Sequence, residues 1–185
     1  MKKLFILKLI VFLSTFHLSF SQNITEQSNF FVENGELQYR KVFEIEGITE
    51  EDLISKLNTY LPSVSGLNDI TFNGGAFTGN LNGFIVDFKK YGARLKDVFL
   101  QLQHPINSKI SIQVKDNRYR VILSDIKGLA PYPIGEFEYF YTLTDRKLNN
   151  ESFHQREIAI NGMNYMDEAF TEKFTLKESQ VNDDW

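Results

Sequence analysis

Two alternating segments joined by a short polar turn place the strongest constraint on the fold of this chain. Ile110, Ile112 and Val114 alternate with polar residues, and the alternation resumes over residues 119–123. Residues 115–118 between them read Lys-Asp-Asn-Arg, a composition typical of tight turns. Because successive side chains of a strand point to opposite faces, this pattern predicts an antiparallel β-hairpin with one buried face.

A helix is predicted to begin after Thr49. Thr49 is a favourable N-cap residue, Asp52 follows at the position of a capping-box partner, and the two glutamates between them suit the positive end of the helix dipole. Pro62 is expected to end the helix. The apolar stripe of this helix comprises Leu53, Ile54, Leu57, Tyr60 and Leu61.

Further strands are predicted where alternation or apolar runs recur. Residues 37–45 alternate, with Lys41 as the one charged residue on the apolar face. Residues 70–72 and 77–88 look extended, and the glycines among and between them indicate turns or bulges. Residues 137–143 alternate once more.

Two other segments have helical spacing. Residues 93–102 fit a helix or a strand, and both interpretations stay open. A late helix is predicted from Met163, Met166, Phe170 and Phe174, with Asp167, Glu168 and Glu172 on its outer side. Strands and helices without regular alternation of the two indicate an α+β domain.

The first 21 residues have the features of a secretory signal peptide. A basic start leads into an apolar run, and Ser19 and Ser21 are suitable small residues for cleavage before Gln22. Lys8 leaves an apolar stretch shorter than the ~20 residues that span a membrane, so we expect a cut rather than a retained anchor. The predicted organisation is a signal peptide at 1–21, a linker or leading strand at 22–34, one domain at 35–176 and a polar tail at 177–185.

Composition excludes several classes of function. The chain has no cysteine, which removes thiol catalysis, disulfides, thiolate metal sites and attachment of a lipid to cysteine. Residues 22–185 carry 17 basic and 24 acidic side chains, a net charge of −7. Such a charge disfavours nucleic acid and anionic membranes as partners. Together with the signal peptide, the missing cysteine leads us to expect an exported protein, periplasmic or secreted, with no stable membrane anchor after cleavage.

The order of these features resembles a known family. The strand-to-helix segment "GELQYRKVFEIEGITEEDLISKLNTYL", the hairpin "SKISIQVKDNRYRVILSDI" and the late stretch "MDEAFTEKFTLKES" are similar to exported Bacteroidota proteins that carry a domain of unknown function with a TBP-like fold. The resemblance covers roughly residues 35–176. It implies a curved antiparallel sheet with helices packed on one face and an envelope location, and it implies no activity.

The candidate binding residues lie on two predicted strands. On the first strand the candidates are Arg118, Tyr119 and Arg120, and because the arginines flank Tyr119, both guanidinium groups share one face. Cross-strand pairing with Glu or Asp is the favoured interpretation, and an acidic ligand is the alternative. Phe137, Tyr139 and Tyr141 would belong to the core, or would line a concave apolar site if the curved sheet were only partly covered.

No residue pattern identifies a catalytic site, a metal site or a cofactor. His104 and His154 lie 50 positions apart, and the glycine-rich segment 73–83 lacks the end of a phosphate-binding loop. Paired carboxylates occur at Glu44 and Glu46 and at Glu136 and Glu138, where the solvent face of a sheet explains them.

These observations lead to three alternative hypotheses about function. The first is a non-catalytic periplasmic binding or interaction module, with a small apolar or peptide ligand or another envelope protein as its partner. The second is a structural or accessory envelope protein, and the third, more remote, is a hydrolase that uses paired carboxylates.

Overall fold

The described part of the chain forms one antiparallel sheet covered by helices. The computed structural model describes residues 26–33, 36–131, 134–138 and 156–177. Its strands are β1 (Glu26–Gln27), β2 (Phe30–Glu33), β3 (Glu36–Glu44), β4 (Leu67–Asn73), β5 (Ala76–Phe84), β6 (Ile106–Lys115), β7 (Arg118–Ala130) and β8 (Gly135–Glu138). Its helices are α2 (Glu50–Tyr60) and α4 (Glu157–Phe174), with the short 3-10 helices η1 (Leu61–Ser63), η2 (Leu95–Asp97) and η3 (Leu100–Gln103).

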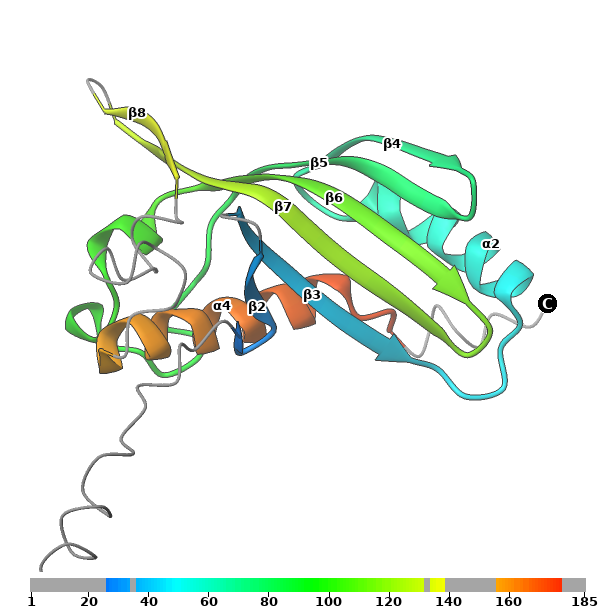
Figure 1. Ribbon diagram of the computed structural model, residues 1–185, viewed down its shortest axis with the longest axis horizontal. Coiled ribbons are helices and arrows are strands. Elements are labelled where there is room, and N and C mark those ends of the chain that lie inside the picture. The colour runs from blue at the N-terminus through cyan, green and yellow to red at the C-terminus, as the bar shows by residue number, and fades with distance from the viewer. Residues whose placement is uncertain (1–25, 34–35, 132–133, 139–155, 178–185) are drawn as a thin grey trace, which may run out of the picture.

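The sheet is continuous from one edge to the other. Its strand order is β1-β2-β3-β7-β6-β5-β4, and all neighbours run antiparallel (Figure 1). The long strand β7 pairs with β6 on one side, and on the other side with β3 over 118–123 and then with β8 over 127–130. Among the described strands, β1 and β4 therefore end the sheet.

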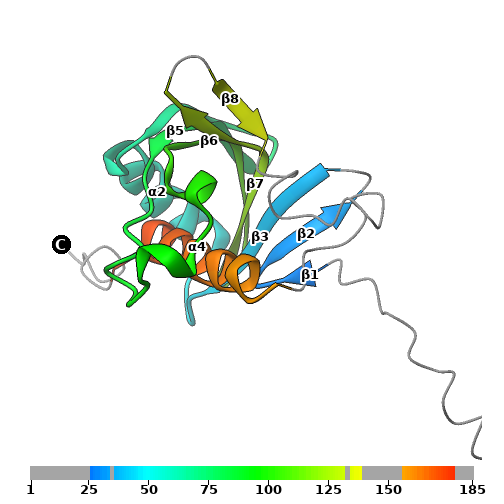
Figure 2. The same cartoon turned by 90° about the vertical axis from the view of Figure 1, so that its left-hand side faces the viewer.

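Both α-helices lie on the inner side of the curved sheet. In the end view the sheet bends around α4, and α2 lies beside it (Figure 2). The buried apolar side chains of the strands and helices form one cluster between these layers. The α+β class and the curved sheet with helices on one face are thus confirmed.

The predicted hairpin is present and extends further than the sequence indicated. Strands β6 and β7 pair from Lys115 and Arg118 at the turn to Ile106 and Gly128 at the far end. Ile110, Ile112, Val114, Tyr119, Val121 and Leu123 all face the core. The two turn residues, Asp116 and Asn117, also support the start of α2.

Helix α2 begins as predicted, with help from a distant segment. The Thr49 Oγ1 atom accepts a hydrogen bond from the Asp52 backbone N–H at 3.2 Å. The Glu50 N–H donates to the carboxylate of Asp116 at 2.8 Å, and the Ile48 N–H donates to the side-chain oxygen of Asn117 at 3.2 Å. Side chains of the hairpin turn therefore satisfy one free backbone donor of the first helical turn, at Glu50, and one just before the N-cap, at Ile48.

A polar cluster fastens α4 to β3. The prediction that Asp167 lies on the outer side of the late helix is wrong. Its carboxylate accepts hydrogen bonds from the Tyr39 hydroxyl at 2.8 Å and the Asn29 amide at 2.9 Å, and it pairs with Lys41 at 3.4 Å. Lys41 also donates to Thr171 at 2.7 Å. The lone charge on the apolar face of β3 thus has its partner on α4.

Aromatic rings fill the space between α4 and the sheet. The Phe170 ring lies 4.9 Å from that of Tyr39, 5.6 Å from that of Phe84 and 6.3 Å from that of Phe30, as measured between centroids. Burial, with the Asp167 carboxylate nearby, raises the pKa of the Tyr39 hydroxyl, which therefore stays a donor.

Three further predicted segments can be compared with the observed elements. Residues 93–102, open between helix and strand, contain the 3-10 helix η2 and most of η3, which ends at Gln103. The described residues of 22–34 include the strands β1 and β2, of which β2 pairs with β3 and buries Phe30 fully. The alternating segment 137–143 begins in β8, and its residues after Glu138 lie outside the described ranges.

The edge strand β4 is interrupted near its start. Its pairing with β5 shifts register between Asn68 and Thr71, and Asp69 between them has a φ of 55°. The shift marks a β-bulge, which bends the edge and breaks its ladder of hydrogen bonds.

Candidate functional site

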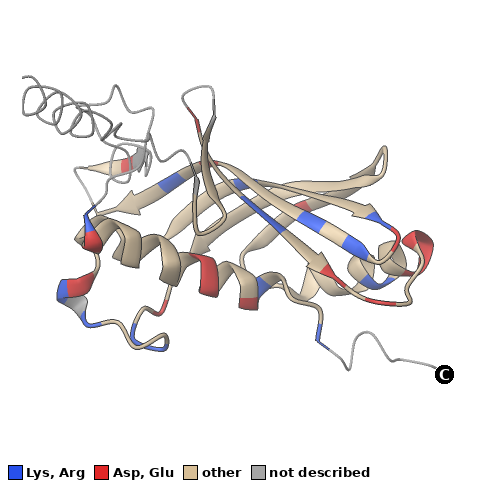
Figure 3. Ribbon diagram, turned by 60° about the horizontal axis from the view of Figure 1, so that its bottom comes forward, with Lys and Arg blue, Asp and Glu red and all other residues tan. Residues whose placement is uncertain are grey.

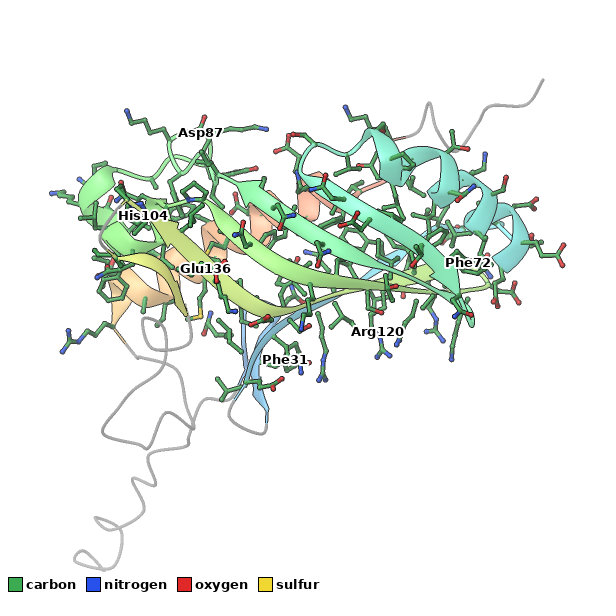
Figure 4. All side chains as sticks on the ribbon, turned by 90° about the horizontal axis from the view of Figure 1, so that it is seen from above. Phe31, Phe72, Asp87, His104, Arg120 and Glu136 are labelled. Atoms are coloured by element: carbon green, nitrogen blue, oxygen red, sulfur yellow. The ribbon has the colours of Figure 1, made fainter. Side chains whose placement is uncertain are left out.

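Arg118 and Arg120 lie together on the outer face of the sheet, as the alternation predicted. Both side chains are exposed on β7, and in register they stand opposite Glu44 and Val42 of β3 and opposite Lys115 and Gln113 of β6. Figure 4 shows Arg120 and Phe31 projecting on the same side of the sheet, away from α2. No described element covers this face here.

The outer face is hollowed at this point. A shallow depression of about 220 Å³ is lined by Val42, Gln113, Lys115, Arg118, Tyr119 and Arg120. Val42 is 48% exposed and forms an apolar floor between the charged side chains. The Arg120 guanidinium donates to the side-chain oxygen of Gln113, with its Nε at 3.1 Å, and this contact fixes its position.

The cations around this depression have no acidic partner within the described ranges. The expectation that Arg118 and Arg120 pair with carboxylates across the sheet is wrong: Glu44 faces Arg118 in register without forming an ion pair, and the partner of Arg120 is Gln113. Basic residues recur along the strands, whereas acidic residues are prominent on α4 and near the start of α2 (Figure 3). The outer face here thus combines three cations that form no ion pair with any described residue and a small apolar patch.

Tyr119 lies on the opposite face, in the core. It is 1% exposed, and its ring stacks on that of Phe43 with centroids 4.9 Å apart. Its hydroxyl donates to the Phe174 carbonyl at 2.6 Å and accepts from the Leu176 N–H at 3.2 Å. Burial raises the pKa of this hydroxyl. The side chain therefore anchors the end of α4 and is not available to a ligand on the outer face.

The aromatic candidates of the last predicted strand are placed only in part. Phe137 belongs to β8, where its backbone pairs with Gly128. Tyr139 and Tyr141 lie outside the described residues, so their role stays a prediction. The inner, concave side of the sheet is filled by α4 and the core, and a site on the described sheet must therefore use the outer face.

The remaining polar candidates lie apart from the depression. His104 follows η3 and Glu136 lies on β8, at the end of the sheet remote from Arg120 (Figure 4). Glu46 is exposed in the turn after β3, and His154 lies outside the described residues. Within the described ranges, no group of three or more His, Asp or Glu side chains is arranged to hold a metal ion.

Comparison with known proteins bears on the fold. No family model matches the chain, and no curated protein matches it. Among solved structures, a TBP-like protein from Parabacteroides distasonis aligns with a TM-score of 0.52 at 16% identity, over 81% of this chain and 96% of that one. This chain has a TBP-like fold. A DUF4468 family protein from Bacteroides ovatus is also similar, with a TM-score of 0.47 at 14% identity over 80% of this chain and 91% of that one.

The likeness confirms the fold that the sequence resemblance implied. The likeness to the Parabacteroides distasonis protein, at 16% identity, concerns the fold alone. A shared fold carries no function by itself, so a function has to be argued from the site. Within the described ranges, neither α-helix has the length and apolar character needed to cross a membrane.

Sequence reasoning missed half of the depression. Val42, Gln113 and Lys115 line it with the two arginines, yet each was assigned only to a strand or a turn. Lys115 and Gln113 could have been found, because a tight turn at 116–117 places them directly opposite Arg118 and Arg120. Val42 could not, since it comes from a strand whose neighbour the sequence does not specify.

Proposed function

We propose that this protein is a non-catalytic binding module of the bacterial periplasm, whose outer sheet face binds an acidic segment of a partner protein. The observation that carries the proposal is the group of cations around Val42. Arg118, Lys115 and Arg120 are exposed and lack acidic partners among the described residues, although residues 22–185 carry a net negative charge. A local positive site on an acidic protein selects for the opposite charge.

The chemistry of the depression favours carboxylates presented by a flexible chain. A guanidinium binds a carboxylate through two parallel hydrogen bonds, and it keeps its charge at any physiological pH. The depression is too shallow to enclose a small molecule, but a chain lying across the strands could reach both arginines and Lys115 in turn. Val42 would then contact an apolar side chain between two acidic ones.

Binding of a defined acidic peptide tests this proposal. We expect a fluorescently labelled oligo-glutamate peptide with a central valine to bind the full chain, as measured by anisotropy. The double variant Arg118→Gln and Arg120→Gln should bind the peptide about tenfold or more weakly, because two charge-assisted contacts are removed. Affinity should also fall with added salt, since exposed charges are screened beyond about 8 Å at physiological ionic strength.

A matched variant separates the site from overall charge. Lys89→Gln with Lys96→Gln removes the same number of positive charges from exposed positions that do not line the depression. We expect this variant to bind the peptide as the unchanged protein does. Equal loss in both double variants, or no binding of the peptide at all, would refute the proposed site.

The proposed compartment depends on the signal peptide predicted at residues 1–21. A basic start, an apolar run interrupted by Lys8 and small residues before Gln22 support export followed by cleavage. N-terminal sequencing of the protein recovered from the periplasm of its host should begin at Gln22. Recovery of a chain that still begins at Met1 would contradict the assignment.

A further inference from the structure

A second groove lies on the helical side of the molecule, distinct from the depression on the outer face. It has a volume of about 430 Å³ and runs between η1, the residues that follow β5 and the C-terminal half of α4. Its apolar wall includes Val64, Phe84 and Ile85, of which Ile85 is 60% exposed. The volume falls in the range of ~300–1,000 Å³ that is common for small-molecule sites.

A half-buried lysine lies in this apolar wall. The ammonium of Lys173 lies 4.3 Å from the centre of the Phe84 ring and donates one hydrogen bond, to the Ser65 carbonyl at 2.6 Å. Among the described residues no carboxylate lies within ion-pairing distance of it. Burial lowers the pKa of Lys173 because the charged form loses water. An anionic ligand beside Lys173 would therefore stabilise the charged form of its side chain.

The acidic residues of the groove are already engaged or exposed. The Glu172 carboxylate accepts hydrogen bonds from Lys90 Nζ and from the Tyr91 hydroxyl, the latter at 2.7 Å. Asp87 is exposed and accepts from the Lys90 backbone N–H at 3.3 Å. Neither carboxylate forms an ion pair with Lys173, and Lys177 also lines the groove. The groove thus combines an apolar wall with cationic side chains.

We propose that this groove binds an aliphatic monocarboxylic acid, with the carboxylate on the Lys173 ammonium and the hydrocarbon chain against Val64, Phe84 and Ile85. The ligand carboxylate takes up N–H donors that the described residues leave unused. The chain covers Ile85, which is exposed in the unbound protein. Charge and apolar surface are both required, and that requirement distinguishes this ligand from a simple anion or a neutral lipid.

Titration with sodium octanoate, followed by ¹H–¹⁵N correlation spectra of the full chain, tests the proposal. We expect saturable shifts confined to residues around the groove, and weaker or absent binding of acetate and 1-octanol, which lack the chain and the charge respectively. Lys173→Met keeps the length of the side chain and removes its charge, and it should weaken octanoate binding by about tenfold or more. Ile85→Asp, at an exposed position, should also abolish binding.

Matched controls make either result interpretable. Lys89→Met removes an exposed lysine that does not line the groove, and it should leave the octanoate affinity unchanged. The Arg118→Gln and Arg120→Gln double variant should bind octanoate as the unchanged protein does. If the proposed binding of an acidic peptide to the outer face failed, the octanoate site would therefore be unaffected. Absence of saturable shifts, equal affinity for 1-octanol, or unchanged affinity in both the Lys173→Met and Ile85→Asp variants would overturn the proposal.

Discussion

Replacing Phe170 with alanine should destabilise the protein by about 3–5 kcal/mol, the range measured when a buried aromatic ring is removed. Phe170 is fully buried and contacts the rings of Phe30, Tyr39 and Phe84, which come from three different strands. These strands cannot close on the vacated volume together, because each is held in the sheet by its neighbours. Urea unfolding monitored by far-UV circular dichroism would measure the change. A domain with the usual stability of about 5–15 kcal/mol would lose a large part of it.

Phe72→Ala is the matched control for this change. It deletes the same ring from the edge strand β4, where Phe72 is 44% exposed and contacts the ring of Phe77. We expect a loss of less than half that of Phe170→Ala, because partial exposure leaves less apolar area to return to water. Equal losses in the two variants would show that α4 is not the centre of the core.

Replacing Gly66 with alanine should destabilise the protein by about 2–5 kcal/mol through two separate costs. Gly66 precedes β4 with a φ of +83°, a conformation that costs an alanine about 1–2 kcal/mol. An added Cβ would also lie 2.8 Å from the carbonyl oxygen of Asn82, whose N–H donates to the Gly66 carbonyl at 2.8 Å. Because the clash is with backbone, relief requires a shift of the strand, at a further cost of about 1–3 kcal/mol. Thermal or urea unfolding would measure the sum.

Gly92→Ala separates these two costs. Gly92 has nearly the same backbone conformation, with a φ of +85°, but an added Cβ would meet no atom within 4 Å. This variant should therefore lose only the conformational part, about 1–2 kcal/mol. If both glycine variants lost the same stability, the close approach between Gly66 and Asn82 would have no energetic weight.

Local signals predicted the elements of this fold well. The turn at 116–117 indicates a hairpin, and Thr49 followed by acidic residues indicates the start of a helix. Both signals are readable because the groups that interact lie within a few residues of one another. Segment 93–102, in contrast, remained open between helix and strand. Its apolar spacing suits a helix, but the segment forms only the short 3-10 helices η2 and η3, with Val98 and Leu102 buried.

Long-range pairings were beyond the reach of the sequence. Lys41 on an apolar face and Asp167 on a helix each read as an isolated charge, and only the fold brings them to 3.4 Å from one another. Asp116 likewise supports a helix start 66 positions away. Such contacts depend on the order of strands in the sheet, which alternation along one strand does not encode.

The candidate site was predicted in half of its residues. The alternation around Tyr119 correctly placed Arg118 and Arg120 on one face, and the same alternation places Tyr119 on the other, in the core. The sequence could not decide whether Arg118 and Arg120 form salt bridges or remain without an acidic partner. It depends on whether an acid reaches the arginines across the sheet, and Gln113 occupies that position beside Arg120.

The bulge at Asp69 limits how this chain can associate with copies of itself. A free strand edge is a template on which another chain can add a strand, and continued addition produces fibrils. Regular pairing in β4 resumes only at Thr71 and ends at Asn73, so an incoming strand would find a ladder of three residues before the turn. Asp69 would also bring a charge to the contact. We therefore expect this end of the sheet to resist edge-to-edge aggregation, even at high protein concentration.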